Sequence, residues 1–383
     1  MTYKDFLVKF SKFLNIIGLR RLQKHIKVGL FRLIGWALGS KTVALPDKSQ
    51  IENILIVKQD HQMGDMLCAT PIFTALREAF PEAYITLIAG QKNYHVVRNH
   101  PALSEVIFFN KLEYLSSPKG WLAFYRKLHE RPYDLGIVPA TVSVSVTSDM
   151  ICRLSGAPYR LGVKKLDGKE NPTSFLFNLP LELDWREKPI HQSQRNLEIL
   201  HGLDIFSENT NLSTGTTPEE DDFAETFFNK NLPGKKTAIG FHPGAGKAGN
   251  LWGAEKFAQA ANALAAQFDA RIFITCGPDD LTIVEQMTRH LNAEFVICSG
   301  LSIGQIAALL RKMTLYIAND TGTMHLAAAM NTPTLAIFGP TDPVQWAPLG
   351  DQHRCVRGEK GELAAVTVES VLSAAQEMMQ AIK

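Results

Sequence analysis

The segment that most restricts the fold of this chain is residues 315–343, where two short apolar runs flank a strong helix former. Residues 315–318 are apolar, too few for a helix and bounded by polar residues, which predicts a buried strand of a parallel sheet. Residues 324–330 favour a helix that ends near Asn331, and residues 334–338 form the second apolar run. Strand, tight loop, helix and strand in this order predict one βαβ unit of a doubly wound sheet.

The loop after the first of these strands lies where doubly wound sheets bind their ligands. The free amides at the start of the following helix carry partial positive charge and suit a phosphate. Thr321 and Thr323 add hydroxyl donors, and Gly322 permits close approach of the backbone. Asp320 can accept hydrogen bonds from sugar hydroxyls. Alternatively, Asp320 or Thr321 merely caps the helix, and this segment alone leaves both interpretations open.

Length and composition predict a folded protein of more than one domain. The 383 residues exceed the usual size of a single domain, and 45% hydrophobic with 20% charged residues is ordinary for a globular chain. A net charge of +2 gives no reason to expect a nucleic-acid partner. Five cysteines without metal-ligand spacing favour a reduced, cytoplasmic compartment. No carboxylate pair has a spacing suited to a metal, so none is expected.

Positive charge is concentrated at the start of the chain. Residues 1–49 contain ten Lys or Arg and two acids, whereas the remainder contains 30 basic and 36 acidic residues. Apolar residues at helical spacing within residues 3–38 predict two basic amphipathic helices. These helices would either attach residues 1–45 to the anionic inner face of the cytoplasmic membrane or dock on the body of the protein. No apolar run approaches the ~20 residues of a membrane span.

Strands alternate with helices along the rest of the chain, which predicts α/β domains with parallel sheets. Residues 160–190 are predicted to be irregular and residues 209–220 turn-like. We expect the two α/β domains to face each other across a cleft between their strand ends. The expected parts are a helical extension at 1–48, a first domain at 49–205, a second domain at 235–355 and a C-terminal helix within 356–383 that packs back on the body.

A glycine-rich loop follows the first strand of the second domain. Gly244 and Gly246 free backbone amides that can cradle an anion, and Lys247 can add positive charge. The same loop matches the Gly-x-Gly-x-x-Gly fingerprint of dinucleotide-binding proteins. However, its helix begins only near Ala254, and the next strand does not end in an acid that would hold a ribose. A nicotinamide enzyme is therefore disfavoured. The loop is then either an anion-binding loop or a plain connecting turn.

Gly64 and Asp65 occur where the first strand of the first domain gives way to a helix. Asp65 is either the N-cap of that helix or a general base that faces the cleft. A helix N-terminus lowers the pKa of a carboxyl group, which would keep Asp65 ionised and weakly basic. His61 is a rival base.

Taken together, these motifs resemble glycosyltransferase family 9, the ADP-heptose:lipopolysaccharide heptosyltransferases. The similarity spans about residues 52–350 and rests on four motifs. In the first domain the motif is residues 54–58 with Met63-Gly64-Asp65 and Thr70-Pro71. In the second domain the motifs are His242-Pro243-Gly244-Ala245-Gly246 with Trp252, residues 319–326 and residues 338–343. The resemblance implies a GT-B fold, in which two Rossmann-like domains face a central cleft. The C-terminal domain would hold a nucleotide sugar, and the N-terminal domain would hold the acceptor.

The resemblance also implies a metal-independent, inverting transfer of heptose from ADP-L-glycero-β-D-manno-heptose to a lipopolysaccharide core sugar. No cofactor is implied, and the acceptor is a lipid-linked oligosaccharide. The family's base falls on Asp65 and its sugar contact on Asp320. Its ribose contact falls on Asp280, with Asp279 as the alternative, and its adenine contact lies near Leu301. The full set of implied binding residues is Met63, Gly64, His242, Gly244, Ala245, Gly246, Lys247, Asn250, Asp280, Leu301, Asp320, Thr321, Gly322, Thr323 and His325.

One position departs from the family pattern. Many members carry a lysine two residues before the tryptophan that corresponds to Trp252, where it neutralises the diphosphate; here that position is Asn250. Lys247, three residues earlier, could take its place. A transferase of the same fold that uses another nucleotide sugar for a different surface glycan, and a non-catalytic nucleotide-binding module, are the alternatives.

Overall fold

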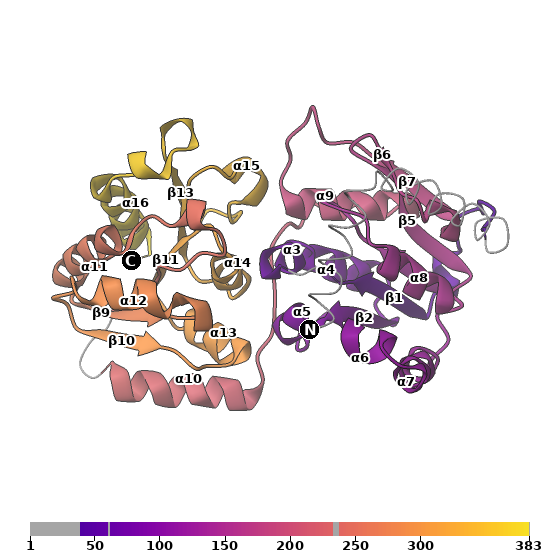
Figure 1. Ribbon diagram of the computed structural model, residues 1–383, viewed down its shortest axis with the longest axis horizontal. Coiled ribbons are helices and arrows are strands. Elements are labelled where there is room, and N and C mark those ends of the chain that lie inside the picture. The colour runs from indigo at the N-terminus through magenta and orange to yellow at the C-terminus, as the bar shows by residue number, and fades with distance from the viewer. Residues whose placement is uncertain (1–38, 60–61, 233–236, 383) are drawn as a thin grey trace, which may run out of the picture.

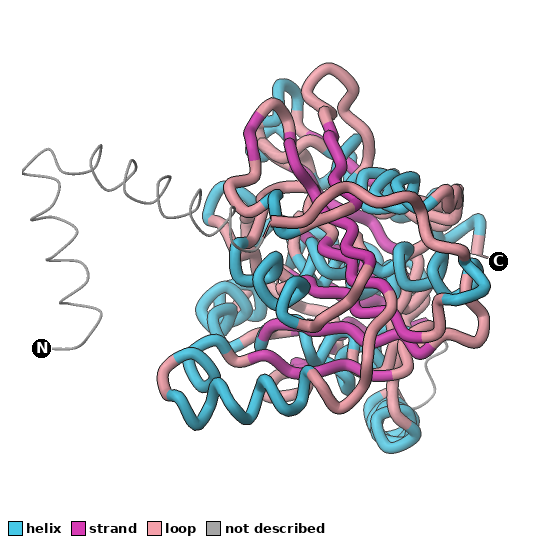
Figure 2. The backbone as a smooth tube through the Cα atoms, turned by 90° about the vertical axis from the view of Figure 1, so that its right-hand side faces the viewer, coloured by secondary structure: helices cyan, strands magenta, loops and turns pink. Residues whose placement is uncertain are grey.

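The computed structural model describes residues 39–59, 62–232 and 237–382, so the predicted N-terminal helices and His61 lie outside the described residues. The described chain forms two lobes that lie side by side (Figure 1). Figure 2 shows that the strands run through the middle of the molecule, with helices to either side of them. Within these ranges, no helix is both long and apolar enough to cross a membrane.

The first lobe is built on a seven-stranded sheet with the order β3-β2-β1-β4-β5-β6, in which β7 pairs with β5. All pairs are parallel except β5 with β6. The strands are β1 (Asn53–Lys58), β2 (Tyr84–Gly90), β3 (Glu105–Phe109), β4 (Leu135–Val138), β5 (Tyr159–Leu166), β6 (Lys169–Glu170) and β7 (Leu179–Leu183). The helices are α3 (Met63–Leu67), α4 (Thr70–Ala79), α5 (Gln91–Val97), α6 (Lys111–Leu115), α7 (Pro118–Leu128), α8 (Val146–Leu154) and α9 (Gln192–Glu198).

The second lobe is built on a six-stranded, fully parallel sheet with the order β10-β9-β8-β11-β12-β13. The strands are β8 (Thr237–His242), β9 (Ala270–Thr275), β10 (Phe295–Cys298), β11 (Leu315–Asn319), β12 (Thr334–Phe338) and β13 (Arg354–Arg357). The helices are α10 (Pro218–Asn231), α11 (Ala254–Phe268), α12 (Leu281–Thr288), α13 (Ile303–Arg311), α14 (Gly322–Ala329), α15 (Pro343–Trp346) and α16 (Val368–Ala381). The strand order reverses between β8 and β11, which makes their loops a topological switch point.

The central strands are apolar along their whole length because both of their faces are covered. In β1, Ile54 and Ile56 face one core and Leu55 and Val57 face the other. The first of these cores continues from the first lobe into the second. It includes Met66 of α3 as well as residues of α10, α13 and α14. A buried apolar contact therefore joins the two lobes next to the ends of α3 and α14.

The connection between the lobes is tied down by side chains. The amide of Ser213 donates to Thr70 Oγ1 at 3.0 Å, and His100 Nε2 lies 2.7 Å from Ser213 Oγ. Glu220, in the first turn of α10, forms an ion pair of 2.6 Å with Arg98 of the first lobe. Glu220 also completes a capping box with Thr217, which fixes the start of α10.

The βαβ unit predicted at residues 315–343 is confirmed as β11, α14 and β12. The single helix expected at Gly64 and Asp65 is divided into α3 and α4, because Pro71 lies in the first turn of a new helix. The C-terminal helix α16 packs on α11 and on strands of the second sheet.

Two sequence-based expectations were wrong. Residues 160–190 are not irregular, since they contain β5 and β7, and the polar Lys164 and Lys165 together with Pro180 hide the strand pattern. Residues 209–220 are not turn-like throughout, because residues 209–217 form no regular element and α10 begins at Pro218. This helix is acidic and weakly amphipathic, so its apolar face is difficult to recognise in the sequence.

Candidate active site

The candidate site lies where the carboxyl ends of β8, β9 and β11 meet the N-termini of α3 and α14. Two adjoining cavities open there. The larger measures about 640 Å³ and belongs to the second lobe, apart from Met63 of α3. The smaller measures about 450 Å³ and is lined by both lobes. Cavities of this size at a switch point can each hold part of a small ligand.

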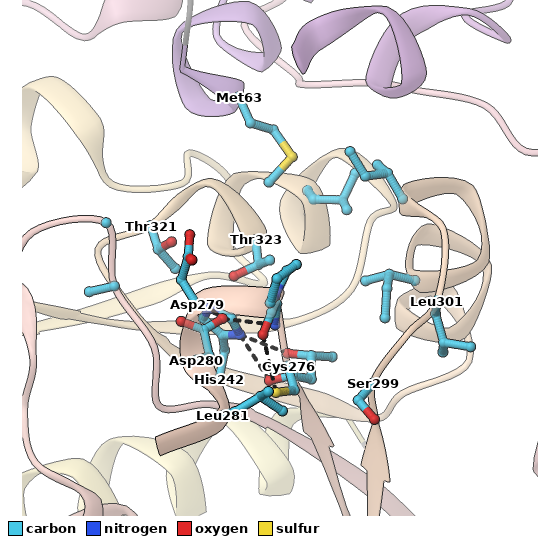
Figure 3. Close-up of a pocket in the computed structure, with 18 of the residues that line it drawn as sticks. Met63, His242, Cys276, Asp279, Asp280, Leu281, Ser299, Leu301, Thr321 and Thr323 are labelled. Atoms are coloured by element: carbon cyan, nitrogen blue, oxygen red, sulfur yellow. Dashed lines mark hydrogen bonds and ion pairs between the residues drawn. The ribbon is translucent and has the colours of Figure 1, made fainter. Parts of the chain in front are cut away.

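The larger cavity has a polar side and an apolar side (Figure 3). Thr321, Thr323 and Asp280 lie on one side of the view and Leu301 on the other, while Met63 reaches toward the cavity from α3. Further apolar lining comes from Ile303, Ile306 and Leu326, while Leu281 lies beside Asp280 (Figure 3). This division suits a ligand with a flat apolar ring at one end and polar sugar and phosphate groups at the other.

A buried polar chain runs beneath the polar side of the larger cavity. Tyr316 OH lies 2.6 Å from Thr275 Oγ1, which lies 3.0 Å from His242 Nδ1. His242 Nε2 lies 3.7 Å from Asp280 Oδ2. Burial lowers the pKa of His242, and the Asp280 carboxylate only partly opposes this effect. We therefore treat His242 as neutral at physiological pH.

Asp280 joins two of the loops that form the cavity. Its Oδ2 accepts a hydrogen bond of 2.8 Å from the amide of Gly277. A Cβ added to Gly244 would lie 2.1 Å from Asp280 Oδ1. Residue 244 must therefore be glycine for Asp280 to occupy this position. Gly244 thus contributes by leaving room for Asp280, and it lines neither cavity.

Asp65 lies in the first turn of α3, is partly exposed and lines the smaller cavity. The N-cap of α3 is Gln62, so the alternative that Asp65 caps the helix was wrong. From the second lobe, Lys247, Asp320 and Thr321 line the same cavity. A carboxylate of the first lobe thus shares one space with a cation, a second carboxylate and the start of α14.

Asp320 does not cap α14. Thr321 occupies the N-cap position, and its side chain makes no capping hydrogen bond. Asp320 Oδ2 instead accepts a hydrogen bond of 2.8 Å from Asn250 Nδ2. Burial raises the pKa of Asp320, whereas hydrogen bonds from Thr341 and Asn250 and the charge of Lys247 act in the opposite direction.

Asn319 organises the glycine-rich loop, a role that the sequence analysis did not assign. Its Nδ2 donates to the carbonyl oxygens of Pro243 at 2.8 Å and Gly244 at 3.2 Å, and its Oδ1 accepts from the amide of Trp252 at 3.2 Å. Asn319 is fully buried. A buried asparagine at the end of a core strand was the available signal, because such a side chain must satisfy its polar groups nearby.

His325 lies at the seam between the lobes. Its Nδ1 is 3.8 Å from Cys68 Sγ of the first lobe, and burial lowers its pKa to about 3. The sequence-predicted residues that line the larger cavity are Met63, His242, Ala245, Gly246, Asp280, Leu301, Thr321 and Thr323. Those that line the smaller cavity are Met63, Gly64, Asp65, Gly246, Lys247, Asn250, Asp320, Thr321, Gly322 and His325. Among the described residues, no group of three or more His, Cys, Asp or Glu side chains is placed to hold a metal.

Two doubly wound lobes, with a cavity of about 640 Å³ in the second and a carboxylate of the first in the adjoining cavity, form an arrangement that fits the class of GT-B glycosyltransferases. The chain matches the model of glycosyltransferase family 9 (heptosyltransferase) over residues 121–375. It therefore belongs to this family, as the sequence motifs predicted, and is a glycosyltransferase.

Known relatives agree with this assignment. Lipopolysaccharide heptosyltransferase 3 of Escherichia coli strain K12 is 25% identical over 353 residues, which cover 82% of this chain and 95% of that protein. A family 9 glycosyltransferase structure from Veillonella parvula DSM 2008 matches with a TM-score of 0.76 and 21% identity, covering 89% of this chain and 100% of that one. The Escherichia coli ADP-heptose lps heptosyltransferase II structure matches with a TM-score of 0.69 and 20% identity, covering 86% and 99%. The expected GT-B fold is confirmed.

Proposed function

We propose that this protein is an inverting, metal-independent transferase that moves heptose from ADP-L-glycero-β-D-manno-heptose to a sugar of the lipopolysaccharide core, with Asp65 as general base. One observation carries the proposal. Asp65 of the first lobe lines the same cavity as Lys247, Asp320 and Thr321 of the second lobe. This arrangement supports a reaction between a donor held by one lobe and an acceptor held by the other.

The larger cavity would bind ADP. The adenine would lie on the apolar side near Leu301, the ribose near Asp280, and the diphosphate at the loop that contains Gly246 and at the start of α14. Amides at a helix N-terminus and in a glycine-containing loop favour an anion. Lys247 is exposed and lines the adjoining cavity, so it can neutralise the diphosphate in place of a lysine at position 250. The relative solved from Escherichia coli is named for ADP-heptose, which favours this nucleotide over others.

The sugar of the donor would extend into the smaller cavity, where Asp320 accepts hydrogen bonds from its hydroxyls. In the reaction, the acceptor oxygen attacks the anomeric carbon from the face opposite ADP, and its proton passes to Asp65. The bond to the diphosphate oxygen breaks, and ADP leaves as the anion that the loop amides, Thr321 and Thr323 stabilise. Preorganised donors of this kind supply several kcal/mol of transition-state stabilisation. Attack from the opposite face inverts the anomeric centre.

Binding and turnover together test this function. Calorimetry should show ADP binding at least tenfold more tightly than UDP or GDP, a difference of about 1.4 kcal/mol. Incubation with ADP-heptose and a core oligosaccharide that lacks one heptose should release ADP and give a product whose new anomeric configuration is opposite to that of the donor. Selective binding of UDP or GDP would favour a transferase with another donor sugar. Absence of all nucleotide binding would favour a non-catalytic protein.

We further propose that the N-terminal extension brings the cleft to the inner face of the cytoplasmic membrane, where a lipid-linked acceptor is found. The truncation that tests this should stop before Ser40. The amide of Ser40 donates to Phe175 O at 2.8 Å and its hydroxyl accepts from Arg160 Nη2 at 2.6 Å, so residue 40 belongs to the first lobe. Deletion of residues 1–38 should abolish binding to anionic vesicles and leave the melting temperature unchanged. Unchanged vesicle binding would favour docking of the extension on the protein.

A further inference from the structure

Asn250 is a buried amide at the end of an otherwise exposed turn. It is the last residue of η4 (Ala248–Asn250), and it is 5% exposed, whereas residues 246–249 are all exposed. Its Nδ2 donates to Oδ2 of Asp320 at 2.8 Å and to the main-chain oxygen of the same residue at 3.3 Å. One amide nitrogen thus holds both the carboxylate and the backbone of Asp320.

The contact from Asn250 is not needed to hold its own loop. Asn319 already binds that loop on both sides of Asn250, at Pro243 and Gly244 before it and at Trp252 after it. Trp252 is further fixed by a hydrogen bond of 2.9 Å from its Nε1 to Val366 O. Because Asn319 and Trp252 secure the loop, the main remaining effect of Asn250 falls on the orientation of Asp320.

An amide nitrogen is only a donor, so its partner must be an acceptor. A hydrogen bond from Asn250 therefore favours the ionised form of Asp320 and holds one of its two carboxylate oxygens in a fixed direction. Asp320 is half-buried, and burial raises the pKa of its carboxyl group, so the ionised form needs such support. The cavity in front of Asp320 also contains the ionisable groups Asp65, Lys247 and His325.

We propose that Asn250 is a positioning residue for the donor sugar, which holds the Asp320 carboxylate ionised and in the orientation that accepts hydrogen bonds from sugar hydroxyls. This inference rests on the proposed function, because the donor sugar is the group that Asp320 would contact. Asn250 itself need not touch the substrate. Its role is to keep the Asp320 carboxylate ionised, so that it can accept hydrogen bonds from the donor sugar although burial disfavours the ionised form.

The decisive variant is Asn250→Asp, which keeps the shape of the side chain and replaces its donor with a second carboxyl group. Two ionised carboxylates at hydrogen-bond distance repel each other, so the pair would share a proton at low pH and lose it as the pH rises. The shared proton restores a donor to Asp320. The kcat/KM of the variant for ADP-heptose should therefore be about tenfold or more below that of wild type at pH 8.5, and the deficit should shrink as the pH is lowered to 6. Asp65, Lys247 and His325 are present in both proteins. The ratio of the variant's kcat/KM to that of wild type therefore reports on the pair formed by residue 250 and Asp320.

Two further variants complete the design. Asn250→Ala removes the donor at every pH, so its deficit should not shrink as the pH is lowered from 8.5 to 6. Asn262→Asp is the matched control. Asn262 is also an amide that bridges loop backbone, to His290 O at 3.0 Å and Asn292 N at 2.8 Å, but it does not line either cavity of the site. Its kcat/KM should follow that of wild type at all pH values.

The outcomes separate the two levels of the proposal. An Asn250→Asp deficit that does not depend on pH, or one that equals the deficit of Asn250→Ala at every pH, would overturn the role of Asn250 while leaving the proposed function intact. Wild type that does not turn over ADP-heptose would overturn the proposed function, and the donor role of Asn250 with it. Melting curves provide a substrate-free check on the contact. The melting temperature of Asn250→Asp should fall below that of wild type by more at pH 8 than at pH 5, because ionisation of the second carboxyl is disfavoured in the folded state.

Discussion

The ring of His325 lies directly against the backbone of Gly64, so that a Cβ added to Gly64 would be only 2.8 Å from His325 Cδ2. The contact joins α14 of the second lobe to α3 of the first. A second contact of the same kind lies beside it, since a Cβ added to Gly322 would be 2.7 Å from Met63 Cε. In each contact, a glycine of one helix therefore packs against a side chain of the other helix. This close approach brings Asp65 to the cavity that holds the start of α14.

Gly64→Ala should destabilise the contact between the lobes. The ring of His325 is buried, so it cannot move aside easily. Overpacking of this kind costs about 1–3 kcal/mol, although alanine by itself would favour the helix by up to about 1 kcal/mol. Chemical denaturation should show the loss. Gly249→Ala is the control, because its Cβ would meet only Pro340 Cγ at 4.0 Å. Equal free energies of unfolding for the two variants would mean that the close contact between Gly64 and His325 does not contribute to stability.

Asn319→Ala should loosen the donor loop. The substitution removes the hydrogen bonds that Asn319 makes to Pro243, Gly244 and Trp252 and leaves those buried backbone groups without this partner. We expect a loss of about 2–4 kcal/mol in the free energy of unfolding and weaker binding of ADP, measured by denaturation and calorimetry. A variant with wild-type ADP affinity would show that the loop does not depend on this residue.

Acid should destabilise the protein through its buried histidines. Burial lowers the pKa of His100 to about 4, below the usual 6.5, and it similarly lowers the pKa of His191 and His353 to about 4. The stability that depends on neutral His100 is fully present above pH 6.5 and is lost as the pH falls toward 4. A shift of this size corresponds to about 3 kcal/mol.

His100→Asn tests this contribution. The Nδ1 of His100 accepts from the amide of Ala102 at 3.2 Å, and an asparagine oxygen can replace that acceptor without titrating. The variant should lose less stability than wild type between pH 6.5 and pH 4, measured by denaturation at each pH. Parallel curves would show that protonation of His100 does not drive the acid transition.

The strands of both sheets could be predicted wherever a short apolar run is buried on both faces. β11 and β12 follow from the apolar runs at residues 315–318 and 334–338 for this reason. The loops of the site followed as well, since ligands of doubly wound sheets bind at the carboxyl ends of the strands. α10 was missed because its acidic sequence hides its apolar face, although Pro218 and the Thr217 capping box marked its start.

The contacts between the lobes could not be predicted from the sequence. Cys68 and His325 are 257 positions apart, and nothing local to either residue indicates the other. The role of Asn250 was similarly hidden. The resemblance to family 9 indicated only that an amide stands where a lysine is common, whereas the structure shows which carboxylate this amide contacts. Such contacts depend on how two folded units meet, and short-range patterns carry no information about that.

The central claim is that the carboxylate of Asp65 takes the proton of the acceptor hydroxyl. The most direct test is the rate of ADP release by Asp65→Asn with ADP-heptose and the core acceptor, together with calorimetry of ADP binding. Asp351→Asn, a change at an exposed turn of the second lobe, is the control. We predict that Asp65→Asn binds ADP as wild type does and that its kcat falls by about 10²–10⁴-fold. Release of ADP at the wild-type rate by a correctly folded Asp65→Asn would contradict the account.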